Sequence, residues 1–142
     1  MPSRCKSRQS ALQILYLRDL RQIPADQAIS SFYNSLSPDD AEPDNEPDPF
    51  AEDLATGVLG DLAAIDALII QFAENWRMER MAVVDRNILR LAVYELGWRG
   101  DTPPKVVINE AIEIAKKFGT AESSRFINGI LDRVHRELRP AS

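Results

Sequence analysis

Apolar residues recur along this 142-residue chain at helical spacing, and they nowhere alternate long enough to predict a strand. Stripes that return every three or four positions are typical of helices that bury one face. The pattern therefore predicts an all-α protein. The clearest stripes are Ala28, Ile29, Phe32, Tyr33 and Leu36; Ile65, Leu68, Ile69, Phe72 and Trp76; and Ile127, Ile130, Leu131, Val134 and Leu138.

Capping and breaking residues divide the pattern into about seven helices. Pro24 suits a first helical turn, and Asp48-Pro49 supplies an N-cap followed by a first-turn proline. Gly119 is expected to end the sixth helix. The first expected helix covers about 7–21, the second opens at Pro24, the third opens near Phe50, and the fourth follows the stripe from Ile65. The last three cover about 85–97, 104–118 and 122–138.

The segment 37–49 differs in composition from the rest of the chain. It holds four prolines, six acidic residues and no aliphatic side chain larger than alanine. Such a segment cannot bury enough apolar area to offset the cost of ordering it, which predicts a solvated, mobile linker. Its acids lack the spacing of a calcium loop. We expect one domain over 1–142, with an N-terminal subdomain over about 1–78 that contains the linker, and a C-terminal subdomain over about 79–142.

Composition argues against the common enzyme and membrane classes. Cys5 and His135 are the single cysteine and the single histidine, too few for an intrachain disulfide or for a four-ligand zinc site. The chain has no glycine-rich phosphate loop and no Gly-x-Ser-x-Gly motif. Its apolar runs are too short to span a bilayer, and its start lacks the pattern of a signal peptide. We expect a cytoplasmic protein that is not an enzyme and holds no metal or cofactor.

Charge is distributed unevenly along the chain. Removing the six acids of 37–49 from the net charge of −5 leaves +1, and residues 1–22 carry +4. Arg4, Lys6 and Arg8, here called the basic arm, lie on or just before the first expected helix. Cations placed in this way bind phosphates by releasing condensed counterions. The alternative is a frayed, solvated terminus.

Phe126 lies off the apolar stripe of the last helix. Helical spacing places it beside Glu122, with Arg125 further round the same helix. An aromatic ring next to such groups can stack on an unpaired nucleobase; the alternative is packing against a neighbouring helix. Phe118, just before Gly119, would join these residues at the helix–helix corner, although it is also in phase with the core. We call Phe118, Glu122, Arg125 and Phe126 the aromatic corner.

Three longer motifs resemble one known family. They are Asp85-Arg86-Asn87-Ile88-Leu89-Arg90-Leu91-Ala92-Val93-Tyr94-Glu95-Leu96, the run from Pro104-Lys105-Val106-Val107 to Lys117-Phe118-Gly119, and Phe126-Ile127-Asn128-Gly129-Ile130-Leu131-Asp132. They are similar to the NusB family of transcription antitermination factors. Arg8-x-x-Ala11-Leu12-Gln13-x-Leu15-Tyr16 is similar to the first helix of that family. The likeness spans nearly the whole chain; it is specific over 85–134 and loose over 23–84.

The resemblance implies an all-helical fold of two subdomains and an RNA-binding adaptor rather than an enzyme. Such a protein pairs with NusE, a ribosomal small-subunit protein. Together the two bind the single-stranded boxA element of nascent ribosomal RNA leaders and join NusA and NusG on RNA polymerase. Matching positions imply phosphate contacts for the basic arm and base contacts for the aromatic corner.

Two further residues take their expected roles from the resemblance alone. Tyr16 and Asp85 correspond to positions that meet NusE. From the residues themselves, Tyr16 is expected at the edge of the core and Asp85 as the cap of the fifth helix.

The sequence departs from the family pattern at several points. Cys5 and Ser7 interrupt a denser arginine cluster, which predicts weaker RNA binding and a shallower salt dependence. Asp85 stands where a glutamate is common. The acidic linker looks longer than usual, and we hypothesise that it repels unspecific RNA.

Two alternatives stay open. One, because of the interrupted basic arm, is a helical scaffold that has lost RNA binding. The other, because the NusB-like fold also occurs in such enzymes, is the RNA-binding extension of an rRNA cytosine methyltransferase, for which the chain leaves no room before Ser142. The sequence is compatible with a monomer or a homodimer.

Overall fold

The computed structural model describes residues 3–35, 48–73 and 78–138, and this part of the chain forms seven α-helices and no strand. The all-α prediction is confirmed. None of the described helices is long and apolar enough to cross a membrane. The helices are α1 (Arg4–Arg21), α2 (Ala25–Ser35), α3 (Pro49–Gly60), α4 (Leu62–Phe72), α5 (Val83–Tyr94), α6 (Pro104–Phe118) and α7 (Ser123–Leu138), with a 3-10 turn η1 (Met78–Arg80) and a π-helical turn η2 (Glu95–Arg99).

The starts of two helices follow from their capping residues. The Asp48 side chain accepts a hydrogen bond from the Ala51 N–H, and Pro49 occupies the first turn of α3, as the sequence predicted. Ser3 accepts from the Lys6 N–H, so α1 starts at Arg4 rather than near Ser7. The first turn of α1 therefore carries most of the basic arm on a regular helix.

The fifth helix differs from its predicted bounds at both ends. It begins at Val83, which puts Asp85 inside the first turn; the prediction that Asp85 caps the helix is wrong, since Ala82 holds the cap position. At the other end the chain widens into η2, a change that side-chain spacing alone does not reveal. Gly100 closes this turn at φ 74°, a left-handed conformation that glycine adopts without strain.

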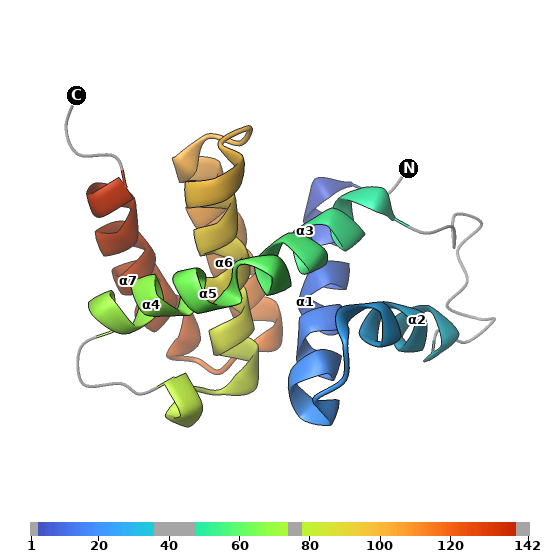
Figure 1. The fold of residues 1–142 in the computed structure, drawn as a ribbon. Coiled ribbons are helices and arrows are strands. Elements are labelled where there is room, and N and C mark those ends of the chain that lie inside the picture. The colour runs from blue at the N-terminus through green and yellow to red at the C-terminus, as the bar shows by residue number, and fades with distance from the viewer. Residues whose placement is uncertain (1–2, 36–47, 74–77, 139–142) are drawn as a thin grey trace.

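The helix α5 lies at the centre of the fold. It packs against α1, α3, α4, α6 and α7, while α6 and α7 lie side by side. Figure 1 shows α3 and α4 following one another across one side of the molecule, with α1 and α2 near α3 and α7 near α4. The buried side chains of these helices form one connected core.

Two expectations about domain organisation stay predictions. The division into subdomains near residue 78 is one; α4, expected in the first subdomain, packs on α5 and α7. The acidic linker is the other, because residues 36–47 lie outside the described part of the chain, as do Leu36 and Trp76 of the predicted stripes. Asp48, its last acid, is buried and accepts a 2.6 Å hydrogen bond from the Ser7 hydroxyl.

Candidate nucleic-acid interface

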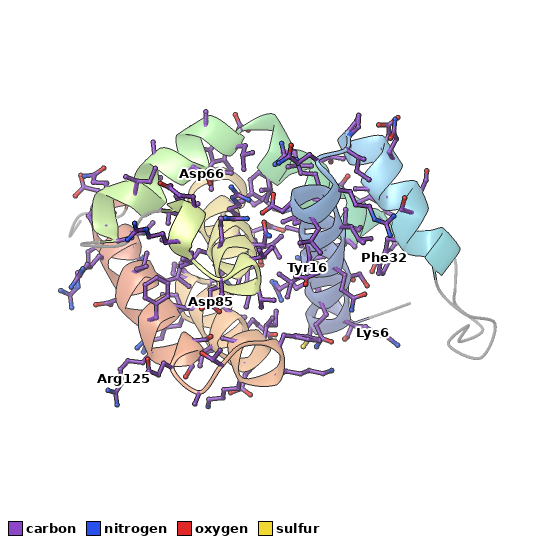
Figure 2. All side chains as sticks on the ribbon, turned by 90° about the horizontal axis from the view of Figure 1, so that it is seen from below. Lys6, Tyr16, Phe32, Asp66, Asp85 and Arg125 are labelled. Atoms are coloured by element: carbon purple, nitrogen blue, oxygen red, sulfur yellow. The ribbon has the colours of Figure 1, made fainter. Side chains whose placement is uncertain are left out.

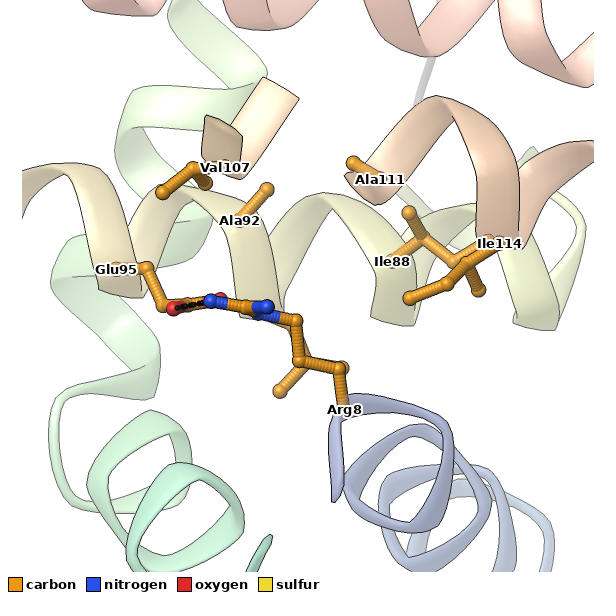
Figure 3. A pocket seen from close by; sticks show the side chains of 8 residues that line it. Arg8, Ile88, Ala92, Glu95, Val107, Ala111 and Ile114 are labelled. Carbon is orange, nitrogen blue, oxygen red and sulfur yellow. Dashed lines mark hydrogen bonds and ion pairs between the residues drawn. The ribbon is translucent and has the colours of Figure 1, made fainter. Parts of the chain in front are cut away.

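The three cations of the basic arm occupy different environments. Arg4 and Lys6 are exposed, whereas Arg8 is only 4% exposed. The Arg8 Nε donates to Glu95 Oε2 over 2.7 Å, and its second terminal nitrogen donates to Oε1 over 2.8 Å, as Figure 3 shows. Because a carboxylate already holds this guanidinium inside the protein, the prediction that Arg8 contacts phosphate is corrected: Arg8 joins α1 to η2.

The surroundings of Arg8 favour its charged form despite burial. Burial by itself lowers the pKa of Arg8, but the hydrogen bonds and negative charge of Glu95 outweigh it and raise the pKa above the ordinary value. The adjoining cavity of about 10 Å³ is lined mainly by apolar side chains from α5 and α6. That space is no larger than about one water, so the pair is packed into the core.

Arg4 lies against a second cationic residue that comes from a distant segment. Its guanidinium carbon is 4.3 Å from the centre of the Phe50 ring, and that of Arg99 is 5.0 Å from the same centre. Both arginines donate to the Asp101 carboxylate, over 3.3 Å from Arg4 and over 3.2 and 3.4 Å from Arg99. Chiefly through the hydrogen bonds from Arg99, the pKa of Asp101 falls to about 2. Sequence reasoning missed Arg99, since no local pattern connects η2 with the start of α1.

The end of α6 lies beside the start of α1. Lys117 Nζ donates to Gln9 Oε1 over 3.1 Å and stands 5.3 Å from the centre of the exposed Phe118 ring. This hydrogen bond links the last turn of α6, which carries Phe118, to α1. Lys6 of the basic arm and Arg125 of the aromatic corner lie apart in the view of Figure 2.

The turn between α6 and α7 is tight, and it requires glycine. A Cβ atom on Gly119 would lie 2.5 Å from the Ser123 hydroxyl oxygen and 2.8 Å from the Ala115 carbonyl oxygen. The Ser123 hydroxyl accepts a 2.9 Å hydrogen bond from the Thr120 N–H, which holds the start of α7 in place. Gly119 ends α6 as predicted, and the close approach is the reason that no larger residue fits.

Phe126 shows features of both interpretations that the sequence left open. The ring is half-buried and packs against the core, and it also lines a pocket of about 190 Å³. The pocket brings residues of the aromatic corner together with Asp85, although the sequence placed them in separate sites. The lining residues are Met81, Ala82, Asp85, Thr120, Glu122, Ser123 and Phe126.

Asp85 is a buried acceptor at this pocket. The residue is 9% exposed, and its Oδ1 has no hydrogen-bond partner among the described residues. A buried acceptor without a partner is costly in free energy, and such groups are rare in folded proteins. Figure 2 shows Asp85 at the start of α5, Tyr16 on α1, and Lys6 and Arg125 with side chains that point away from the body of the protein.

A polar network fixes α1 relative to α5 and α4. Asp19 accepts hydrogen bonds from Arg86, Asn87 and Arg90, and Arg90 also donates twice to Asp66, over 2.8 and 3.0 Å. Burial alone would raise the pKa of Asp19, but the charge of Arg90 and the hydrogen bonds lower it below the ordinary value. The network sets the position of the α1 face that carries Tyr16 relative to α5.

Within the described ranges, no group of three or more His, Cys, Asp or Glu side chains is arranged to hold a metal ion. The site instead combines exposed cations, aromatic rings and a buried carboxylate. An all-helical fold with this surface defines a binding protein whose chemistry suits nucleic acid.

Comparison with known proteins specifies the family. The model of the NusB family matches residues 5–136, so the chain belongs to the NusB family. The transcription antitermination protein NusB of Solibacter usitatus is 51% identical over 138 residues, which cover 97% of this chain and 92% of that protein. The protein of the same name from Anaeromyxobacter dehalogenans is 47% identical over 138 residues, which cover 97% of this chain and 94% of that protein.

Solved structures share the fold. T. maritima NusB matches with a TM-score of 0.83 at 36% identity, covering 98% of this chain and 94% of that one. The structure of the antitermination factors NusB and NusE in complex with dsRNA contains a chain that matches with a TM-score of 0.80 at 24% identity. The match covers 94% of this chain and 96% of that one. At that identity the second likeness bears on the fold alone.

Proposed function

We propose that this protein is a transcription antitermination factor that binds the boxA element of nascent ribosomal RNA leaders together with NusE. The observation that carries the proposal is the similarity, over nearly the full length, to relatives named transcription antitermination protein NusB. In this function the protein is a cytoplasmic adaptor that acts by binding rather than by catalysis. It joins RNA polymerase indirectly, with NusA and NusG.

The exposed surface offers separate groups for phosphates and for bases. Arg4 and Lys6, which are exposed, would contact phosphates, and Phe118 is an exposed ring on which an unpaired base could stack. Glu122, in the turn before α7, and Arg125 and Phe126 on α7 would extend this surface. Arg8 supports it indirectly, because its bond to Glu95 holds the first turns of α1 against η2.

The pocket beside Phe126 supports a partner contact next to the RNA surface. Asp85 has an unpartnered oxygen there, and Tyr16 is exposed on α1. A protein partner that donates to Asp85 and covers Tyr16 would lie beside the aromatic corner. NusE in that position would meet the same RNA strand, so we expect the two proteins to bind boxA more tightly together than either does alone.

The test is fluorescence anisotropy with a labelled boxA single strand, with and without purified NusE, over a salt series. We expect binding that tightens when NusE is added and prefers boxA to a scrambled strand. A boxA duplex serves as a competitor, because stacking on the aromatic corner needs unpaired bases. Absence of binding in every arm would contradict the proposal and favour the helical scaffold.

Substitution of Phe126 tests the aromatic corner. We expect Phe126→Ala to weaken boxA binding by about 1–3 kcal/mol, the usual contribution of one stacked base. Phe118→Ala, which removes a more exposed ring, separates stacking from packing, and Val106→Ala at the exposed start of α6 is the matched control. A large fall in the melting temperature of Phe126→Ala with unchanged affinity would show that this ring serves the core alone.

A further inference from the structure

We propose that Arg99 forms, together with Arg4, a phosphate-binding clamp, and that η2 thereby contributes to the RNA surface. The inference rests on the proposed function and adds to it a binding residue from outside α1. Its ligand is the backbone phosphate of a single-stranded RNA. The argument rests on the geometry around Phe50 and Asp101.

The two guanidinium groups already converge on one anion. Asp101 Oδ2 accepts from Arg4 over 3.3 Å, and the two oxygens of Asp101 accept from Arg99 over 3.2 and 3.4 Å. Arginine donors bind carboxylates and phosphates with the same forked geometry. The Asp101 carboxylate therefore marks a position that a phosphate group can occupy.

The ion pairs of Asp101 are exposed, so a phosphate can compete for them. The three hydrogen bonds are all longer than the 2.7 and 2.8 Å bonds that Arg8 makes to Glu95. The Asp101 side chain is 41% exposed and that of Arg4 is 58% exposed, so water already reaches this pair. Exposed ion pairs of this kind contribute little to stability, so a backbone phosphate can compete with Asp101 for the two arginines.

Phe50 holds the clamp in shape. The guanidinium carbons of Arg4 and Arg99 lie 4.3 and 5.0 Å from the centre of its ring, within the range of a cation–π contact. A ring that is fixed at the start of α3 keeps two like charges close together before any ligand arrives. Less side-chain freedom is then lost when a phosphate binds.

The clamp also changes the charge available to RNA. Cys5 and Ser7 interrupt the basic arm, and the structure withdraws Arg8 into the core. Arg99 places a cation next to Arg4 although 95 positions separate them in the chain. Arg99 therefore takes the place of Arg8 as a cation beside Arg4 at the surface.

The experiment compares salt dependences of binding to labelled boxA RNA and to a scrambled strand of equal length, with NusE present. We expect Arg99→Ala to weaken both strands several-fold and to lower the salt slope by about 0.7, the value for one phosphate contact on single-stranded RNA. Arg99→Lys should retain the slope, because it retains the charge. Arg136→Ala, which removes an exposed arginine paired with Asp132 on α7, is the matched control and should change neither quantity.

The direction in which Asp101→Asn changes RNA affinity distinguishes a phosphate clamp from a cluster that only stabilises the fold. If the clamp binds phosphate, removal of the competing carboxylate tightens RNA binding several-fold; if the cluster only stabilises the fold, the same change weakens binding or leaves it unaltered. Thermal unfolding of each variant checks that the fold is intact. An unchanged salt slope in Arg99→Ala, or weaker or unaltered binding in Asp101→Asn, would overturn the clamp.

The two strands separate the clamp from the proposed function. A clamp that holds phosphates does not distinguish sequences, so a slope change on both strands without preference for boxA would overturn the proposed function and support the clamp. A preference for boxA with equal slopes in wild type and Arg99→Ala would overturn the clamp alone. Absence of binding to either strand would overturn both.

Discussion

Arg4 and Arg8 lie one helical turn apart on α1, and both guanidinium groups face the Phe50 ring, at 4.3 and 5.8 Å from its centre. The two guanidinium groups nevertheless differ in their exposure to solvent. Arg8 is enclosed with Glu95 in a bidentate pair whose side chains are 5% and 3% exposed, whereas Arg4 shares the exposed Asp101 with Arg99. The difference shows that two residues of one basic motif can serve the core and the surface separately.

The energetic consequences of the two environments differ in kind. Removing one partner of a buried pair leaves an uncompensated charge inside the protein, at a cost of about 3–5 kcal/mol. An exposed pair contributes about 0–1 kcal/mol, because water and salt screen it. The Arg8–Glu95 pair should therefore contribute mainly to the free energy of unfolding. The Arg4–Asp101–Arg99 cluster should contribute mainly to RNA affinity.

The largest expected effect follows from breaking the buried pair. Arg8→Ala should lower the free energy of unfolding by about 3–5 kcal/mol, because Glu95 is then buried without its cation. Urea denaturation followed by circular dichroism measures the change. The double variant Arg8→Met with Glu95→Leu should regain most of the stability, since neither charge remains. A loss below 1 kcal/mol in Arg8→Ala would mean that the pair is not sealed from water.

An intermediate effect is expected at Asp19, which belongs to a partly buried network of ion pairs. Asp19→Asn should lower the free energy of unfolding at neutral pH by about 1–3 kcal/mol, because Arg86 and Arg90 lose a charged acceptor. Asp66 still holds Arg90, which limits the loss.

The pH dependence of stability provides a separate check on Asp19. Its pKa is lowered in the folded protein, so the stabilisation is present above the ordinary value of 3.8 and is lost as pH falls through the folded-state pKa. Denaturation curves between pH 7 and pH 3 should show a smaller acid-induced loss of stability in Asp19→Asn than in wild type. Parallel curves would contradict the lowered pKa.

The smallest effect on stability is expected at the exposed cluster. Arg4→Ala should change the free energy of unfolding by about 0.5 kcal/mol or less, since it removes a screened ion pair and one exposed cation–π contact. The same denaturation experiment measures it beside Arg8→Ala. RNA affinity should fall in Arg4→Ala. This variant would therefore lose binding with little loss of stability, whereas Arg8→Ala would mainly lose stability. Equal losses of stability in Arg4→Ala and Arg8→Ala would contradict the distinction between an exposed and a buried arginine.

The elements of the fold follow largely from local sequence. The apolar stripes predict the all-helical class, Asp48-Pro49 predicts the start of α3, and Gly119 predicts the end of α6. These features depend on residues within one or two turns of each other, where spacing and capping determine the backbone. The predictions were less accurate at Asp85, because the first turn of α5 has no side-chain cap to mark it.

Only the tertiary structure decided which side chains of the predicted site face the solvent. The burial of Arg8 depends on Glu95, 87 positions away, and the clamp depends on Arg99 meeting Arg4 across Phe50. Asp85 and Phe126 line one pocket because the α6–α7 turn lies against the start of α5. A helical pattern records which face of each helix is apolar, but the partner of that face is set by packing between distant segments, and burial and pairing follow from that packing.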